Sequence, residues 1–177
     1  MAVTIRKLLP ADSPAYRRVR LACLAQHPTS FSSSFEEESL KGRLSLEQKI
    51  EEEAVDAFIM GALDGAELVG ICGFVQGHRW KVRHHGDIRQ VYVAPAYAGR
   101  GVGRALMVQT IRAAFALPEV EQIFLGVVAG NAAANKLYES LGFKECGLQR
   151  KYLKVGNQYF DHRLMVLFRS DFQDALA

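Results

Sequence analysis

The sequence predicts an α/β fold in which about four helices flank a mixed, mostly antiparallel sheet of about seven strands. Three observations support this prediction. A β-branched and aromatic run at residues 91–93 leads through a glycine-rich loop straight into an apolar helix. The pair Asp64-Gly65 separates two apolar runs, as in a tight β-hairpin. A helix with one apolar face begins at Asn131 and ends at Gly142, before the last strands.

The first third of the chain is expected to form one strand and two helices. Residues 2–9 alternate between apolar and polar side chains, which is typical of a strand. Ser13 followed by Pro14 has the pattern of an N-cap and a first helical position, so a helix should run over residues 14–26. The polar segment 29–38 then links to a second helix near residues 44–54.

The rest of the chain alternates between strands and helices. Strands are expected at residues 57–63 and 67–76, and a basic loop at 77–86 leads to a strand at 87–94. A helix follows the glycine-rich loop and ends before Pro118. A short apolar strand at 122–129, the helix that begins at Asn131, and strands at 143–148 and 159–168 complete the order.

Composition limits the kind of protein that this chain can be. Its 177 residues fit one domain, expected to cover residues 1–177, and 49% hydrophobic residues can fill a sizeable core. The net charge of +3 favours a small anionic ligand and is too weak to indicate nucleic acid. Three cysteines without metal-ligand spacing indicate reduced thiols, and no apolar run resembles a secretion signal or reaches the ~18 residues of a membrane span. We therefore expect a cytoplasmic protein with no membrane or nucleic-acid partner.

The loop before the central helix has the features of an anion site. Glycines alternate at positions 99, 101 and 103, where they allow sharp turns and a close approach of a ligand to backbone N–H groups. The helix start adds unpaired N–H donors and a partial positive charge, which suits a phosphate or pyrophosphate. The loop lacks the Gly-Lys-Ser/Thr of a nucleotide P-loop and the G-x-G-x-x-G spacing of a dinucleotide fold. A glycine-rich turn that binds no ligand is the alternative.

Two motifs together resemble the GNAT superfamily of N-acetyltransferases. The segment Ala98-Gly99-Arg100-Gly101-Val102-Gly103 lies over that family's acyl-CoA loop, Q/R-x-x-G-x-G/A, except that Ala98 replaces the usual Arg or Gln. Residues 131–143 match the family's N-x-x-A-x-x-L-Y-x-x-x-G-F signature at every specified position. The departure at Ala98 removes one side-chain contact or loop brace at the pyrophosphate.

The resemblance implies acetyl-CoA as co-substrate and no metal. It also implies that the strands at 87–94 and 122–129 are parallel neighbours that splay apart, so that CoA enters the cleft between them. The backbone of the first strand would pair with the pantetheine arm, and the glycine-rich loop would bind the pyrophosphate. The cofactor residues implied in this way are Val91, Tyr92, Val93, Ala98, Gly99, Arg100, Gly101, Val102, Gly103, Arg104, Asn131 and Tyr138.

The reaction that the resemblance implies is direct transfer of an acetyl group to a primary amine. The backbone N–H of Val93 would stabilise the carbonyl oxygen, which gains negative charge. Tyr138 would protonate the departing thiolate, although an apolar helix face can also simply bury a tyrosine. Asp87 heads the cofactor strand and is the first candidate for the base that deprotonates the amine. The alternatives are a water relay and the side chains of His84, His85, Glu36, Glu37 and Glu38.

The acceptor amine is the least determined part of the prediction. In this superfamily variable loops form the acceptor pocket, and the corresponding residues here include Phe31, Glu37 and Tyr159. The acceptor is either a small amine or the amine of a peptide or protein. The main alternative to an enzyme is a non-catalytic acyl-CoA-binding regulatory domain on the same fold. A homodimer is also expected to be possible, since it is common in the superfamily.

Overall fold

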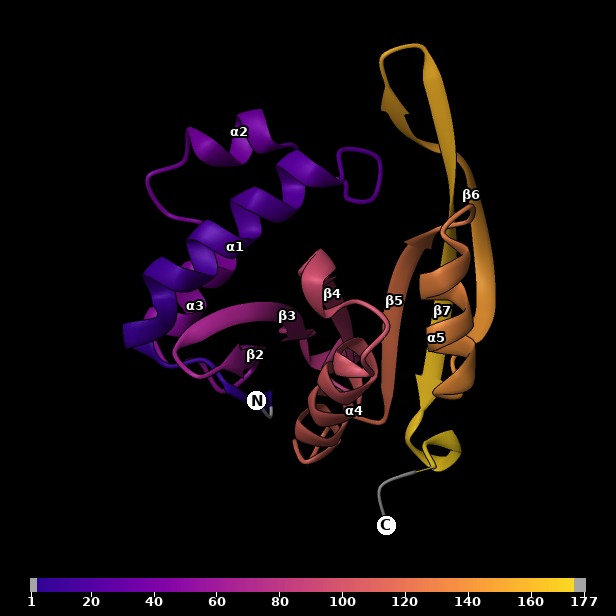
Figure 1. Cartoon of the computed structure of the whole chain (residues 1–177). Helices are drawn as coiled ribbons and strands as arrows, with labels where there is room; N and C mark the ends of the chain where they lie inside the picture. Colours follow the sequence, from indigo (N-terminus) through magenta and orange to yellow (C-terminus); the bar gives the residue numbers. More distant parts are fainter. Residues whose placement is uncertain (1–2, 174–177) are drawn as a thin grey trace.

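The computed structural model describes residues 3–173, in which seven strands form one sheet (Figure 1). The order across the sheet is β1-β2-β3-β4-β5-β7-β6. The strands are β1 (Thr4–Lys7), β2 (Ala57–Asp64), β3 (Glu67–Gln76), β4 (His85–Val93), β5 (Gln122–Val128), β6 (Lys144–Val155) and β7 (Gln158–Phe168). Neighbouring strands β4 and β5 are parallel, and the other neighbouring pairs are antiparallel. The predicted mixed, mostly antiparallel sheet is confirmed.

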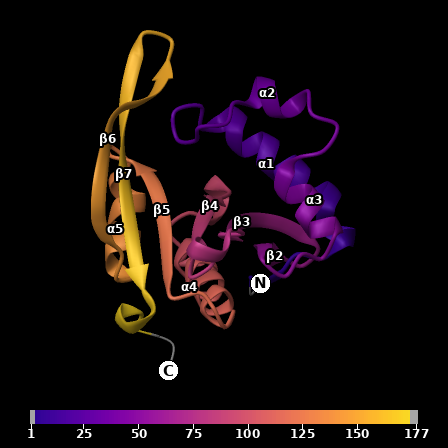
Figure 2. The same ribbon diagram turned by 180° about the vertical axis from the view of Figure 1, so that it is seen from behind.

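Helices cover both faces of the sheet (Figures 1 and 2). They are α1 (Ser13–Gln26), α2 (Phe35–Ser39), α3 (Ser45–Glu51), α4 (Val102–Phe115) and α5 (Ala132–Ser140). Successive side chains of β2 point to opposite faces of the sheet. Phe58 and Met60 pack with α4 on one face, whereas Ala57 and Ile59 pack with α1 and α3 on the other. Within residues 3–173, none of the helices has the length and apolar character needed to cross a membrane.

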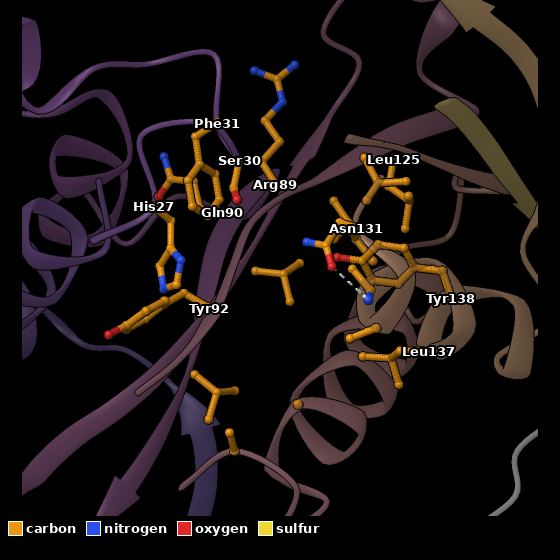
Figure 3. Close-up of a pocket in the computed structure, with 18 of the residues that line it drawn as sticks. His27, Ser30, Phe31, Arg89, Gln90, Tyr92, Leu125, Asn131, Leu137 and Tyr138 are labelled. Atoms are coloured by element: carbon orange, nitrogen blue, oxygen red, sulfur yellow. Dashed lines mark hydrogen bonds between the residues drawn. The ribbon is translucent and has the colours of Figure 1, made fainter. Parts of the chain in front are cut away.

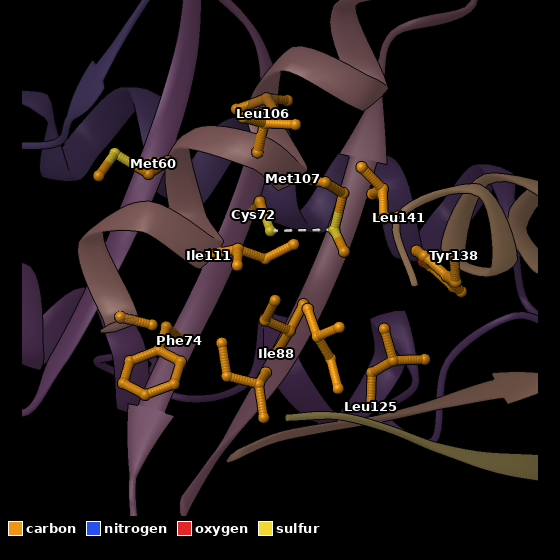
Figure 4. Packing of buried hydrophobic residues seen from close by; sticks show 14 of the residues in the cluster. Met60, Cys72, Phe74, Ile88, Leu106, Met107, Ile111, Leu125, Tyr138 and Leu141 are labelled. Atoms are coloured by element: carbon orange, nitrogen blue, oxygen red, sulfur yellow. Dashed lines mark hydrogen bonds between the residues drawn. The ribbon is translucent and has the colours of Figure 1, made fainter. Parts of the chain in front are cut away.

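The larger hydrophobic core lies between α4 and the central strands (Figure 4). Leu106, Met107 and Ile111 project from α4 and are fully buried, and Cys72 and Phe74 of β3 are buried in the same core. The Cys72 thiol lies 3.7 Å from Sδ of Met107. Full burial of one large aliphatic side chain contributes about 1.5–3 kcal/mol. The start of α4, and the glycine-rich loop before it, therefore rest on a well-packed helix.

Most expected elements are present, and the differences have local causes. The prediction of Ser13 as N-cap is wrong, because a 3-10 turn at Pro10–Asp12 leads directly into helical backbone at Ser13. The segment expected to be a linker contains α2, whose N-cap Ser34 accepts a hydrogen bond from the N–H of Glu37. β6 continues to Val155 because its pairing with β7 extends as a long two-stranded arm (Figure 1). Residue 2 of the first expected strand lies outside the described residues.

The parallel strands β4 and β5 separate partway along their length. Their pairing ends where Ile88 lies opposite Leu125. Just beyond this point a bulge interrupts the pairing of β4 with β3, and Gln90 adopts a left-handed φ of 58°. The Tyr16 hydroxyl donates a hydrogen bond to Oε1 of Gln90 at 2.7 Å and so ties the bulge to α1. A bulge bends and twists its strand, which turns the end of β4 away from β5 and produces the predicted splayed pair.

Candidate functional site

A cavity of about 410 Å³ opens where β4 and β5 separate (Figure 3). At one end it reaches the glycine-rich loop and the start of α5. At the other end it reaches His27, Ser30 and Phe31, which lie in the loop after α1. The cavity therefore runs from the α4 face of the sheet to the α1 face, through the gap between the two strands.

The structure brings most of the predicted cofactor residues together. Those that line the cavity are Val91, Tyr92, Val93, Ala98, Gly99, Gly103, Asn131 and Tyr138. Arg100, Gly101 and Val102 line a neighbouring hollow that shares Tyr97 with the cavity. Arg104 points elsewhere, since its Nη1 donates to Oγ of Ser140 at 2.9 Å and ties α4 to α5.

The backbone of the glycine-rich loop has the conformation of an anion-binding site. Gly99 and Gly101 have φ values of 72° and 78°, in the left-handed region that favours glycine. Gly101 is the N-cap of α4, and the N–H groups of the first turn after it have no acceptor within the helix. The guanidinium of Arg100 lies 5.5 Å from the ring centre of Tyr97 and adds positive charge beside the loop. A phosphate or pyrophosphate is the group that this arrangement suits.

The strand β4 offers its backbone to the cavity. Beyond Ile88, within the described residues, the edge of β4 that faces β5 is paired with no strand. An extended ligand can form main-chain hydrogen bonds along such an edge. The side chain of Tyr92 points to the α1 face, where its hydroxyl donates to Oε1 of Gln26 at 2.9 Å.

The start of α5 and its buried face supply polar groups to the cavity. Asn131 is the N-cap, as predicted, and its Oδ1 accepts the N–H of Ala134 at 3.1 Å. Tyr138 is 7% exposed, and its hydroxyl points into the cavity beside Asn131 (Figure 3). Burial raises the pKa of Tyr138 well above the usual value of 10. The phenol therefore stays protonated at neutral pH, where it can donate a hydrogen bond.

The residues considered as bases do not line the cavity. Asp87 lies next to it, and its Oδ2 accepts a hydrogen bond at 3.3 Å from Nη2 of Arg89, which does line it. His85 lies at the start of β4 and packs edge-on against Phe124 and His84. Among residues 3–173, no group of three or more His, Cys, Asp or Glu side chains could hold a metal ion.

The three predicted acceptor residues do not gather at one place. Phe31 lines the cavity. Glu37 lies in the first turn of α2, where its N–H donates to Ser34. Tyr159 is 51% exposed on the β6–β7 arm, and the ammonium groups of Lys151 and Lys154 lie 5.2 and 5.5 Å from its ring centre. Only the first of the three is thus placed to touch a ligand in the cavity.

Several parts of the site were missed in the sequence. His27 and Arg89 line the cavity but belong to no recognised motif. The β5 wall at residues 125–127 also lines it and has no polar side chain to draw attention. Gln90 forms the bulge and lines the cavity as well. A signal for the bulge exists, because the residues of β4 that face the α4 core are Ile88, Val91 and Val93. Their spacing of three and then two breaks the strict alternation of a regular strand.

Comparison with known proteins connects this geometry to a family. The profile of the Acetyltransferase (GNAT) family matches residues 19–143, which is more than half of the chain. A curated relative, the N-alpha-acetyltransferase RimI of Mycobacterium tuberculosis, is 38% identical over 96 residues. That alignment covers 54% of this chain and 58% of the relative, so the chain spans less than two thirds of the relative's length.

Solved structures share the fold over nearly the whole chain. An acetyltransferase of the GNAT family from Streptococcus pneumoniae superposes with a TM-score of 0.80 at 22% identity, over 94% of this chain and 99% of that one. The Salmonella typhimurium protein yncA, solved with its cofactor acetyl-CoA, has a TM-score of 0.78 at 20% identity, over 95% of this chain and 94% of that one. The family match over residues 19–143, together with this fold, shows that the chain belongs to the GNAT acetyltransferase family.

Proposed function

We propose that residues 1–177 act as a single domain that transfers an acetyl group from acetyl-CoA directly to a primary amine. The observation that carries the proposal is the cavity that passes through the sheet between β4 and β5. At its α4 end, the glycine-rich loop has a backbone conformation suited to binding phosphate. Its α1 end is open to a second ligand. Membership of the GNAT family supports acetyl-CoA as the co-substrate.

The residues present fit acetyl-CoA. The left-handed glycines and the free N–H groups at the start of α4 suit its pyrophosphate. The unpaired edge of β4 at Val91–Val93 suits the amide groups of the pantetheine arm. When bound, the cofactor supplies the acetyl thioester that the amine attacks. Ala98 gives the loop no side-chain donor, so recognition of the pyrophosphate depends on backbone N–H groups and on nearby arginines.

Two groups of the chain assist the transfer. The backbone N–H of Val93, at the end of the bulged strand, donates to the carbonyl oxygen as negative charge develops there. The hydroxyl of Tyr138 donates to the departing sulfur from the α5 wall of the cavity. Because burial keeps this phenol protonated, its role as donor does not depend on pH near neutrality.

The proposal is tested by binding and then by turnover. Calorimetric titration with acetyl-CoA should show saturable one-to-one binding that free CoA competes. Release of CoA thiol is then measured with two acceptors, a peptide with a free N-terminal alanine and spermidine. Turnover of either supports the proposal, binding without turnover favours the regulatory-domain alternative, and no binding at millimolar acetyl-CoA contradicts both.

The role of Tyr138 has its own test. Tyr138→Phe keeps the buried ring and removes the hydroxyl, so kcat should fall by about tenfold to a thousandfold. The dissociation constant for acetyl-CoA should change little, since the ring still packs against Phe143. A wild-type kcat would show that this tyrosine only fills the core.

A further inference from the structure

Gly126 has no side chain, and the imidazole of His162 from a neighbouring strand occupies the space where one would lie. A Cβ built on Gly126 would lie 2.6 Å from Nε2 and 3.0 Å from Nδ1 of His162, and would overlap the ring carbon Cε1. His162 belongs to β7, where it lies opposite Val128 of β5. The ring thus occupies the volume that a side chain at position 126 would otherwise take.

This position is at the point where the two ligands of the proposed reaction would meet. Gly126 lines the cavity and directly follows Leu125, the last residue of β5 that pairs with β4. Along β5, Ile123, Leu125 and Val127 face the α4 core, so position 126 faces the α1 side of the sheet. An amine that enters from the α1 side reaches the gap between the strands beside this imidazole.

Stacking against an aromatic ring of β6 holds the imidazole at this place. The ring of Tyr152 stacks on that of His162, with centroids 4.4 Å apart and planes 13° apart. Tyr152 comes from a bulge in β6, where the register with β7 shifts between Gln149 and Leu153. Within this bulge the N–H of Lys151 donates to Oδ1 of Asp161 at 2.8 Å. Nδ1 of His162 is buried and has no hydrogen-bond partner among the described residues.

We propose that His162 is the base that takes the proton of the acceptor amine, an inference that rests on the proposed function. As the amine nitrogen forms its bond to the acetyl carbon, one N–H proton passes to the imidazole, directly or through one water molecule. The C–S bond breaks, its electron pair stays on sulfur, and sulfur takes a proton from Tyr138. Water returns the imidazolium proton to the phenolate, so both residues are restored and an amide and a free CoA thiol remain.

The surroundings of His162 keep the imidazole neutral. Burial lowers its pKa below the usual value of 6.5, and a hydrogen bond with the backbone of Gly126 partly offsets this effect. From β6, Tyr152 is the titratable side chain that touches the ring. The charged neighbour Arg163 pairs instead with Glu139 and Glu145.

Two more charged or titratable groups lie on the walls of the neighbouring cavity. Arg89 of β4 and His27 of the loop after α1 line this cavity, which His162 adjoins through Gly126. The β5 residues under the ring, Gly126 and Val128, carry no charge. A neutral imidazole has the lone pair that a base requires.

The first test replaces the imidazole by a side chain that cannot titrate. His162→Gln should lower kcat/KM for the acceptor by about a hundredfold to a thousandfold, with the dissociation constant for acetyl-CoA unchanged. The acid limb of the wild-type pH profile should disappear with it. The matched control is His85→Gln, which removes another imidazole with a buried and unpartnered Nδ1 at the start of β4, where β4 is still paired with β5. This control should keep wild-type kinetics.

The second test moves the base onto β5. Because the imidazole occupies the place of a side chain at 126, His162→Ala makes room for one there. The double variant Gly126→Glu with His162→Ala should recover at least tenfold over His162→Ala alone. Gly126→Glu alone should be impaired by its clash with the ring. Recovery in the double variant would not follow from a merely structural role of the histidine.

The outcomes separate this inference from the proposed function. Wild-type kcat/KM and an unchanged acid limb in His162→Gln would overturn the inference while leaving the transferase in place. His27 is a histidine that lines the cavity. If His27→Gln loses activity and His162→Gln does not, the inference about His162 is also overturned and the transferase proposal stands. A wild-type protein that binds acetyl-CoA but acetylates neither peptide nor spermidine would overturn both.

Discussion

Arg20 is a buried charge that the fold leaves only partly hydrogen-bonded. It is 3% exposed on α1, and its guanidinium lies 4.9 Å from the ring centre of Phe31. Its Nε and Nη1 have no hydrogen-bond partner among the described residues. Because burial of an incompletely paired charge costs several kcal/mol, Arg20→Met should leave the free energy of unfolding unchanged or raise it by about 1 kcal/mol. Urea unfolding of the two proteins measures the difference.

Arg17 on the same helix is the matched control. Its Nη1 lies 2.8 Å from Oε2 of Glu47, whose side chain is only 9% exposed. Arg17→Met leaves that carboxylate without its cation, so the free energy of unfolding should fall by about 1–3 kcal/mol. Equal losses in the two variants would mean that Arg20 has a stabilising partner after all.

The environment of His162 also predicts how stability depends on pH. Its pKa is lowered in the folded state, so the unfolded chain takes up the proton first as the pH falls through about 6.5. The contribution of this group to stability is therefore fully present above pH 6.5 and is lost below it. Urea midpoints at about pH 7.5, 6.5 and 5.5 should fall more steeply for the wild type than for His162→Gln. Parallel curves would contradict the lowered pKa.

Local and non-local residues differ in how well the sequence predicts them. Asn131 was predicted as an N-cap and is one, because capping needs only the N–H group of Ala134, three residues later. The position of His162 over Gly126 depends on the register between β5 and β7 and on the bulge that brings Tyr152 to the ring. The residue pattern within β5 or within β7 does not reveal how the two strands are aligned. The sequence alone therefore left the base that deprotonates the amine unresolved.

The glycine-rich loop is the element whose conformation most limits substitution. Gly101 has a φ of 78° at the start of α4, and its Cβ position is open. Gly101→Val should therefore cost about 1–2 kcal/mol in backbone strain without a steric clash. It should also raise KM for acetyl-CoA by at least about tenfold, because the loop N–H groups lose their orientation. Steady-state kinetics with varied acetyl-CoA give the answer.

Gly65 provides a control with the same kind of strain at another place. It has a φ of 61° and open space at its Cβ position, in the turn between β2 and β3. Gly65→Val should lower stability about as much as Gly101→Val while KM stays at the wild-type value. If both variants raise KM equally, the effect comes from general destabilisation and the loop is not the phosphate seat.

At the level of elements, the sequence predicts what periodicity and turn chemistry specify. The hairpin at Asp64-Gly65 and the strand-loop-helix around the glycines are present as expected. The long arm of β6 and β7 could not be predicted, since most residues of β6 are exposed and show no apolar alternation. Backbone hydrogen bonds between β6 and β7 stabilise the arm, because few of its side chains are buried. The arm also carries Tyr159, which explains why this predicted acceptor residue lies away from the cavity.

On the scale of the whole molecule, the proposed cofactor site joins two parts of the sheet. β1–β4 lie on one side of the cavity and β5–β7 on the other, and direct pairing between them ends at Ile88 and Leu125. A ligand that contacts both sides stabilises the folded state by mass action, about 2.7 kcal/mol at a hundredfold excess over its dissociation constant. For a chain of this size, acetyl-CoA should therefore raise Tm by about 5–10 °C.

The same bridging predicts where the ligand protects the backbone. Hydrogen exchange should slow at residues 99–104 on one side of the cavity and at 131–134 on the other, because both line or adjoin it. The tip of the arm at residues 154–158 lies outside the cavity and should exchange at the same rate with and without acetyl-CoA. Protection on the loop side alone would mean that the ligand does not span the gap. The rise in Tm should then be small, since β5 and α5 would gain no contact from binding.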